Sequence, residues 1–254
     1  MNIAVDIGNT NLKYGVLRSD GEVSSHVLRL PSRKTRLDKK NLHELLHLTT
    51  ANACSVPITW RIAQTGRFPW QSLRDEVLKI RPRDKFKTVT RKHIPLKIDV
   101  DSPDKVGIDR LLAAFAATKM YGNSSMLIVD AGSAITVDVV QDGTFCGGAI
   151  LPGLTAMSET YPKISEKLPL VPVHPIAESV YPGKNTEDAI SNGIYWGTIG
   201  AIRQFYEMRF TDAQLILTGG DAEYLHPGLA RAIPQRVVLS PNLVLEGIHW
   251  CFDM

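Results

Sequence analysis

The chain has 254 residues, of which 44% are hydrophobic and 22% charged, a composition that is ordinary for a soluble globular enzyme. Its 29 basic and 26 acidic residues give a formal net charge of +3, so the electrostatic field of the whole protein is weak. The longest apolar runs, such as Met126–Val129 and Leu215–Leu217, are far too short to cross a bilayer, and we expect no membrane span.

Cysteine usage and the start of the chain bear on the cellular compartment. Cys54, Cys146 and Cys251 lie far apart and form no CxxC pair, which argues against a disulfide framework and gives no support for a structural zinc site. The chain enters a strand-like run at Ile3 without the basic and apolar regions of a signal peptide. We therefore expect a cytoplasmic protein.

Basic residues are concentrated in two segments, 33–40 and 67–97. Such segments could attract an anionic ligand or a nucleic acid. A solvated surface is the commoner meaning of a charge run, and no nucleic-acid-binding motif occurs here. We expect no nucleic-acid partner.

In chain order, the residue pattern predicts strands at Ile3–Asp6, Leu12–Arg18 and Glu22–Leu30, a helix at Asn41–Thr50, a strand at Ile58–Ala63 and a helix at Trp70–Ile80. Thr65-Gly66 interrupts the regular structure between the last two of these elements. The next predicted helix, Asp109–Tyr121, is rich in Ala and Leu and has no internal Gly or Pro.

From residue 126 the opening pattern recurs, with predicted strands at Met126–Asp130, Ile135–Val140 and Phe145–Leu151. Each copy is a strand, an Asp-x-Gly turn and two further strands joined by a turn. The two acids, Asp6 and Asp130, lie 124 positions apart (130 minus 6), which is about one domain's length. We interpret this as an internal duplication, and predict an α/β fold with domains at 1–117 and 118–254.

The last third of the chain predicts a long helix that begins at Asn185 or Thr186 and runs to about Met208. Three glycines fall on nearly one face of it, which favours the close approach of another helix: Gly193, Gly197 and Gly200. After this helix we expect a strand at Gln214–Leu217, a turn at Thr218–Gly220 and a final helix after Ser240-Pro241.

The Asp-x-Gly turns carry the chemistry. After Asp6, a tight turn through Gly8 presents backbone N–H groups to an anion, and Asn9, Thr10, Asn11 and Lys13 could donate to phosphate oxygens. An acid contacts phosphate favourably only through a cation, so Asp6 implies Mg²⁺. Alone, this segment is more often an ordinary hairpin turn. A second such turn at Asp130–Thr136 favours phosphoryl transfer to or from a nucleotide.

Two glycine-bearing segments, Thr218–Gly220 and Gly147–Gly153, permit the close approach of a ring or a ribose to the backbone, and the first would suit an adenosine pocket. No GxxxxGK[ST] loop occurs, which excludes a P-loop kinase. At the start of the Ala-rich helix, Asp109 could accept the proton of a substrate hydroxyl and Arg110 could pair with a substrate carboxylate. The local alternative is a helix-capping Asp beside a surface Arg.

The ordered set of motifs resembles the type III pantothenate kinase family, also called the Bvg accessory factor family. The resemblance covers nearly the whole chain and rests on Asp6-x-Gly-Asn-Thr, Gly107-x-Asp-Arg, Asp130-x-Gly-Ser, Gly147-Gly-x-Ile-x-Pro-Gly, Lys167-Leu-Pro, Gly183-Lys-Asn-Thr and Thr218-Gly-Gly.

The resemblance implies a homodimer of two ribonuclease-H-like domains of the actin/hexokinase/Hsp70 type, each a mixed sheet flanked by helices, with ATP in the cleft between the domains. It implies phosphorylation of the primary hydroxyl of pantothenate, the first step of coenzyme A synthesis, with Mg²⁺ and a monovalent cation such as K⁺ or NH₄⁺.

The resemblance also assigns residues. Asp109 would be the general base, and Asp6 and Asp130 would lie near the metal ions. The pantothenate pocket would comprise Val100, Gly107, Ile108, Asp109, Arg110 and, from the partner subunit, Thr186. The ATP site would comprise Asp6, Ile7, Gly8, Asn9, Thr10, Asn11, Leu12, Lys13, Ser133, Gly219 and Gly220.

Two positions depart from the family pattern. Val100 stands where the family has a Tyr that helps to shape the pantothenate pocket, and Ser133 stands where it has Thr. Ser keeps the hydroxyl, whereas Val removes an aromatic wall and a polar tip. Three alternatives therefore stay open: a kinase of another hydroxylated metabolite, a non-catalytic nucleotide-binding regulator, and a phosphohydrolase on the same fold.

Overall fold

The computed structural model describes residues 1–17, 23–29, 45–46, 56–173, 181–209 and 212–252. The chain divides into two compact units. The first comprises residues 1–96, 102–116 and 242–254, and the second comprises residues 97–101 and 117–241. The predicted domains differ from these units in assigning the last residues of the chain to the second half, and the boundary at residue 117 stays a prediction.

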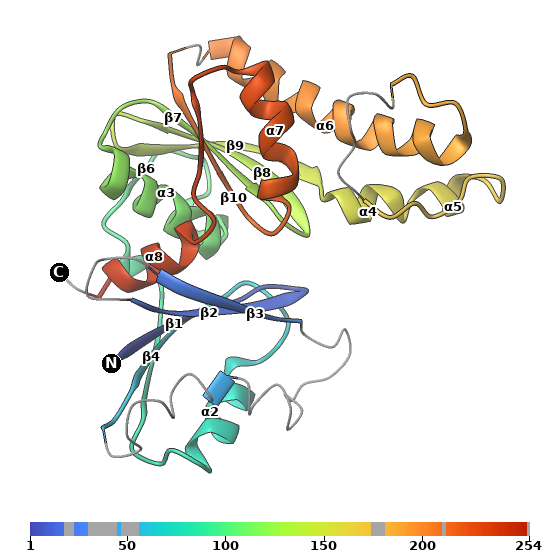
Figure 1. Cartoon of the computed structure of the whole chain (residues 1–254). Helices are drawn as coiled ribbons and strands as arrows, with labels where there is room; N and C mark the ends of the chain where they lie inside the picture. Colours follow the sequence, from blue (N-terminus) through green and yellow to red (C-terminus); the bar gives the residue numbers. More distant parts are fainter. Residues whose placement is uncertain (18–22, 30–44, 47–55, 174–180, 210–211, 253–254) are drawn as a thin grey trace. The chain divides into compact units, whose positions relative to one another are not determined.

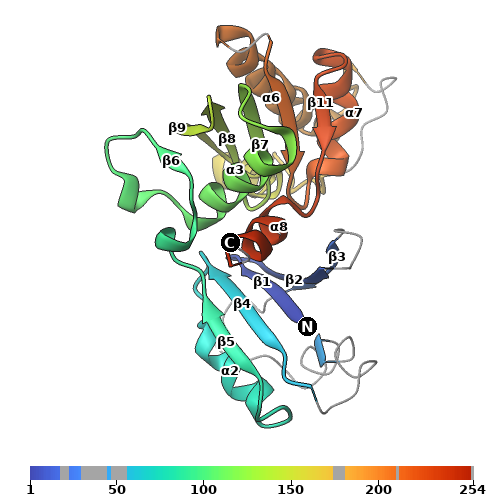
Figure 2. The same cartoon turned by 90° about the vertical axis from the view of Figure 1, so that its left-hand side faces the viewer.

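The first unit is built on a five-stranded mixed sheet with the order β3-β2-β1-β4-β5 (Figures 1 and 2). Its strands are β1 (Asn2–Ile7), β2 (Asn11–Leu17), β3 (Val23–Arg29), β4 (Thr59–Gln64) and β5 (Lys85–Thr88). The first three strands form an antiparallel meander, and β4 and β5 continue the sheet in parallel with β1. Two short 3₁₀ helices follow, η1 (Arg91–His93) and η2 (Pro103–Lys105).

Helices cover both faces of this sheet. The alternating apolar residues of β1 pack with α2 (Trp70–Leu78) in one buried cluster. The other face is covered by α8 (Leu243–Trp250), the last helix of the chain, which packs on β1, β2 and β4 (Figure 1). The predicted helix at 41–50 lies outside the described residues except for Leu45 and Leu46, which are helical.

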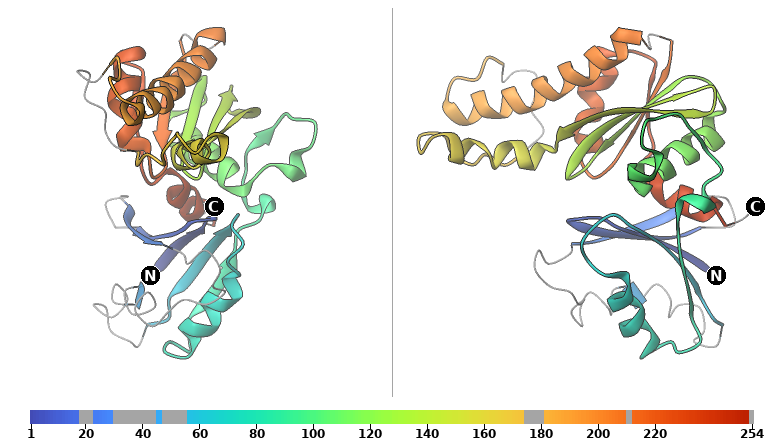
Figure 3. Two further views of the ribbon diagram at one scale, coloured as in Figure 1. Left: turned by 90° about the vertical axis from the view of Figure 1, so that its right-hand side faces the viewer. Right: turned by 180° about the vertical axis from the view of Figure 1, so that it is seen from behind.

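The second unit contains a six-stranded sheet with the order β11-β10-β7-β8-β9-β6. Its strands are β6 (Lys97–Ile98), β7 (Met126–Ala131), β8 (Ala134–Gln141), β9 (Thr144–Pro152), β10 (Gln214–Thr218) and β11 (Val237–Leu239). Its helices are α4 (Leu154–Ser158), α5 (Tyr161–Ile164), α6 (Thr186–Arg209) and α7 (Ala222–Ala232), while α3 (Ile108–Tyr121) belongs partly to each unit. In Figure 3, α6 and α7 lie on the same face of the sheet.

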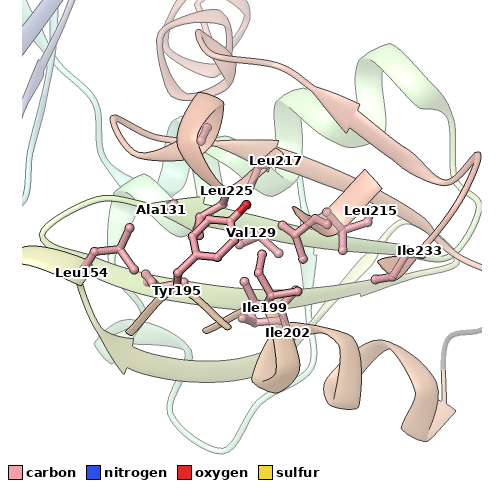
Figure 4. Close-up of a cluster of buried hydrophobic side chains, with 14 of the residues drawn as sticks. Val129, Ala131, Leu154, Tyr195, Ile199, Ile202, Leu215, Leu217, Leu225 and Ile233 are labelled. Atoms are coloured by element: carbon pink, nitrogen blue, oxygen red, sulfur yellow. The ribbon is translucent and has the colours of Figure 1, made fainter. Parts of the chain in front are cut away.

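The core of the second unit lies between its sheet and these two helices. Side chains from β7 and β10 meet Tyr195, Ile199 and Ile202 of α6 and Leu225 of α7 (Figure 4). Because side chains alternate along a strand, Met126 and Ile128 of β7 and Val140 of β8 lie on the opposite face, where they are also buried. That face carries Asp130, near the end of β7.

The two sheets share one plan, which confirms the predicted duplication. In each, three antiparallel strands are followed by two strands parallel to the first, so β1-β2-β3-β4-β5 corresponds to β7-β8-β9-β10-β11. The fold class is accordingly α/β with two mixed sheets flanked by helices. Among the described residues, no helix is both long enough and apolar enough to span a membrane.

Candidate active site

The hairpin between β1 and β2 presents its turn to solvent. Asp6 pairs across the two strands with Lys13, and the Gly8 N–H donates to the Asn11 carbonyl at 3.0 Å. Asn9, Thr10 and Asn11 are exposed, and so can donate to an anion. The side chains of two other predicted ATP-binding residues, Ile7 and Leu12, are fully buried in the core. These two residues can therefore contact a nucleotide only through their backbone groups.

Gly66, which the sequence pattern indicated only as an interruption between a strand and a helix, packs against this turn. Gly66 follows β4, and the N–H groups of Thr65 and Gly66 donate to the Ile7 carbonyl at 3.0 and 2.8 Å. A side chain at Gly66 would collide with the Gly8 carbonyl. The parallel pairing of β4 with β1 places Gly66 there, and that pairing joins residues almost 60 positions apart, which no local pattern reveals.

The corresponding hairpin of the second unit joins β7 to β8. The Gly132 N–H donates to the Ala134 carbonyl at 3.0 Å, and the exposed Ser133 offers its hydroxyl at the tip. The Ser133 carbonyl accepts the Gly153 N–H at 3.3 Å, and a side chain at Gly153 would come within 2.6 Å of that oxygen. The Gly147–Gly153 motif therefore ends in a close backbone contact with the turn at Gly132-Ser133, the second of the two predicted phosphate-binding turns.

The Thr218-Gly219-Gly220 motif lies against the same hairpin. Gly219 has a φ of +99°, in the left-handed region, and a Cβ there would lie 2.5 Å from the Asp130 carboxylate. A Cβ on Gly220 would meet nothing within 4 Å, so the backbone there is open to a flat group. Next to it, the Asp221 N–H donates to the Ala131 carbonyl at 2.9 Å, and burial raises the pKa of the Asp221 carboxyl.

The donor chemistry around Asp130 fits a hard cation. Only glycine at position 219 leaves space beside the Asp130 carboxylate, since a Cβ would fill it. Oxygen ligands of this kind suit Mg²⁺ and K⁺. Within the described residues, no group of three or more His, Cys, Asp and Glu side chains could hold a metal ion by itself. A cation here would take its remaining ligands from phosphate and water, as Mg²⁺ does in nucleotide sites.

The predicted general base begins α3. Asp109 lies in the first turn of the helix, and its Oδ1 accepts the Arg110 N–H at 2.9 Å. A carboxylate at a helix N-terminus is stabilised by the helix dipole. This hydrogen bond uses one carboxylate oxygen, so a capping role and an acceptor role are compatible. Gly107 makes room for the arrangement, because a Cβ there would lie 2.5 Å from Oδ1 of Asp109.

The other predicted pocket residues fall in the second unit. Val100 is half-buried and packs beside Gly147, whose Cβ would lie 3.4 Å from a Val100 methyl group. Thr186 is exposed at the first position of α6. The helix is capped by Asn185, whose Oδ1 accepts the Asp188 N–H at 2.9 Å.

The structure thus groups the predicted residues in two sets. The first unit holds Asp6, the turn after it, Lys13 and the Gly107–Arg110 segment. The second unit holds Val100, Asp130, Ser133, Thr186 and the Gly219-Gly220 pair. Two sheets of one plan, each with an acid followed by a glycine turn, define an α/β class of protein built from two mixed sheets flanked by helices.

Solved structures of this class match the chain over nearly its whole length. A conserved protein named as a Baf family transcriptional activator from Campylobacter jejuni gives a TM-score of 0.59 at 22% identity, covering 99% of this chain and 97% of that one. The activator of the 2-hydroxyisocaproyl-CoA dehydratase from Clostridium difficile, with bound ADPNP, gives 0.56 at 14% identity, covering 99% and 94%. At these identities the likeness shows the fold.

Sequence comparison identifies the family. The model described as "Type III pantothenate kinase" matches residues 2–208. Curated proteins of that name from Persephonella marina and Legionella pneumophila (strain Paris) are each 30% identical to the chain, and each match covers 98% of this chain and 97% of the relative. The chain belongs to the type III pantothenate kinase family.

Proposed function

We propose that the chain transfers the γ-phosphoryl group of ATP to the primary hydroxyl of pantothenate, giving 4′-phosphopantothenate and ADP in the first step of coenzyme A synthesis. The observation that carries the proposal is the family match over 98% of the chain together with an intact Gly107–Arg110 segment at the start of α3.

In the proposed reaction, Asp109 accepts the proton of the pantothenate hydroxyl as that oxygen forms a bond to the γ-phosphorus. The bond between the γ-phosphorus and the β–γ bridging oxygen breaks, and ADP leaves. Arg110 holds the pantothenate carboxylate, for which a guanidinium offers two parallel donors.

The two hairpins bind the nucleotide. Asn9, Thr10 and Lys13 donate to phosphate oxygens from the first hairpin, and Ser133 donates from the second. Gly220 gives the adenosine room against the backbone. Asp6 and Asp130 hold the cations, which are Mg²⁺ and a monovalent ion such as K⁺ or NH₄⁺. When bound, these ions neutralise the charge that develops on the transferred phosphoryl group.

The proposed active unit is a homodimer in which Thr186 of one subunit completes the pantothenate pocket of the other. The exposed glycine face of α6 supports this proposal. Gly193, Gly197 and Gly200 are all exposed, and a Cβ on Gly197 or Gly200 would meet nothing within 4 Å. A helix without side chains along one face lets a second helix approach closely, which explains why α6 tolerates three glycines.

The test measures ADP release from ATP by the purified protein, with and without pantothenate, in Mg²⁺ plus K⁺. We expect turnover that depends on pantothenate, falls without K⁺, and drops at least about 100-fold in Asp109→Asn. Asp104→Asn is the matched control, because Asp104 is an exposed acid that pairs with Arg91 at the surface, and it should keep full turnover. Tight Mg·ATP binding without stimulation by pantothenate would move the assignment to another acceptor or to a regulator.

A further inference from the structure

A second acid lies on the same sheet face as Asp130, and no predicted role accounts for it. Asp138, in the middle of β8, is only 1% exposed. Burying a carboxylate is costly unless it is hydrogen-bonded. The Thr136 hydroxyl donates to Oδ2 of Asp138 at 3.2 Å.

The strand register links this pair to Asp130. In the β7–β8 ladder Asp130 is directly opposite Thr136, and Asp138 lies two residues further along β8 on the same face. Diagonal neighbours of this kind are about 7–8 Å apart. The β8 residues on either side of Thr136, Ile135 and Val137, belong to the core on the other face.

Strand β9 makes room for the buried carboxylate. Gly148 is opposite Asp138, and a Cβ at Gly148 would lie 2.1 Å from the Val137 carbonyl oxygen and 2.8 Å from Oδ1 of Asp138. The register shifts immediately beside this pair, where Gly147 has a φ of +88°. A bulge of this kind bends a strand and re-aims its side chains, and it often lies beside a functional site. Gly148 thus lets β9 approach the β8 backbone closely beside the Asp138 carboxylate, and Gly147 provides the positive φ at the register shift.

The duplicated hairpins differ at this place. In the first unit the residue opposite Asp6 is Lys13, and two positions further along β2 stands Gly15. In the second unit the corresponding residues are Thr136 and Asp138. The first hairpin therefore has the Lys13 ammonium beside its acid, which can bind phosphate alongside a metal ion at Asp6. The second has a hydroxyl tied to another acid, which suits a cation.

We propose that Asp138 is a positioning residue for the cation held at Asp130. By accepting the only proton of the Thr136 hydroxyl, Asp138 turns the lone pairs of that oxygen outward as acceptors toward a cation or its water shell. It also adds a second negative charge near the site. This inference rests on the proposed function, in that it deepens the role given there to Asp130.

Calorimetric titration of ADP at a series of Mg²⁺ concentrations, with a parallel K⁺ series, tests the role without turnover. In Asp138→Asn and in Thr136→Val, we expect the half-saturating concentration of one of the two cations to rise about tenfold. Thr136→Ser keeps the hydroxyl and should restore the wild-type value. Asp142→Asn, which removes an exposed acid from the β8–β9 turn, is the charge-matched control and should change nothing.

Folded variants that keep the wild-type dependence on both cations would overturn the proposal. If Asp138→Asn does not fold, Thr136→Val decides, since it removes the hydroxyl and leaves the buried acid in place. A purely structural role would lower the melting temperature of the variants equally with and without cation, and that result also overturns the proposal. Wild-type protein that binds Mg·ADP but does not phosphorylate pantothenate would refute the proposed function alone. Absence of any cation-dependent ADP binding would refute both.

Discussion

The buried ion pair of the first unit gives the sharpest stability prediction. The carboxylate of Asp84 is 2% exposed and accepts three hydrogen bonds. Arg81 Nε and Trp60 Nε1 donate to its Oδ2 at 2.8 and 2.9 Å, and the Ile58 N–H donates to its Oδ1 at 3.0 Å. Arg81 is itself 5% exposed. Asp84 thus joins the start of β4 to the turn before β5.

Asp84→Asn removes the charge and one acceptor together. An amide has a single oxygen, so wherever it points, its NH₂ group faces a buried N–H donor. An unsatisfied buried donor costs about 1–3 kcal/mol, and removing one partner of a buried ion pair costs about 3–5 kcal/mol in all. Against a typical stability of roughly 5–15 kcal/mol, we expect a loss of about 4 kcal/mol in the first unit.

Urea unfolding followed by tryptophan fluorescence would measure this loss. The control is Asp75→Asn, because Asp75 and Arg74 form an ion pair at 2.8 Å that is mostly exposed. That variant should lie within about 1 kcal/mol of wild type. A loss under 1 kcal/mol for Asp84→Asn would refute the reasoning, since it would mean that the network relaxes to satisfy every donor.

Three further predictions concern separate parts of the chain. Burial raises the pKa of the Glu246 carboxyl in α8, so the folded state holds this proton more tightly and loses stability as pH rises above the ordinary carboxyl value. Glu246→Gln should therefore gain stability relative to wild type at pH 7 but not at pH 4, measured by urea unfolding; equal effects at both would contradict this. Gly219→Ala should abolish Mg·ADP binding in calorimetry, because its Cβ would meet the Asp130 carboxylate and its φ is left-handed; Gly220→Ala, in open space, should be milder. If the wild-type chain sediments as the proposed dimer, Gly197→Leu should sediment as a monomer, and an unchanged dimer would remove α6 from the proposed interface.

The elements that could be predicted from sequence are those whose signal is local. The Asp-x-Gly turns after Asp6 and Asp130 and the Ala-rich run of α3 carry their information within a few neighbouring residues. Helix α7 was not predicted, because Pro227 and Gly228 interrupt its pattern. Tertiary packing overrides that penalty: the Gly228 position lies against Tyr195 and Ile199 of α6, where no side chain would fit.

Contacts between segments that are distant in the sequence could not be predicted from local residue patterns. Gly66 joins the first turn only through parallel pairing of β4 with β1, and Asp84 meets Trp60 only through parallel pairing of β5 with β4. Each residue looks ordinary in its own segment. Their meaning depends on which strands are neighbours, and strand order is set by the whole fold.

The last helix shows how far such dependence reaches. Although α8 ends the chain, it belongs to the first unit, and Gly247 packs so tightly on α3 that any side chain there would strike the Leu112 carbonyl. Leu112 follows Asp109 by one helical turn. Arg61 of β4 donates to the His249 carbonyl and lies 5.4 Å from the Phe252 ring, which holds α8 on the sheet that carries Asp6. The proposed base is therefore positioned by residues at the other end of the sequence, and a change in the last dozen residues can alter catalysis without touching a substrate.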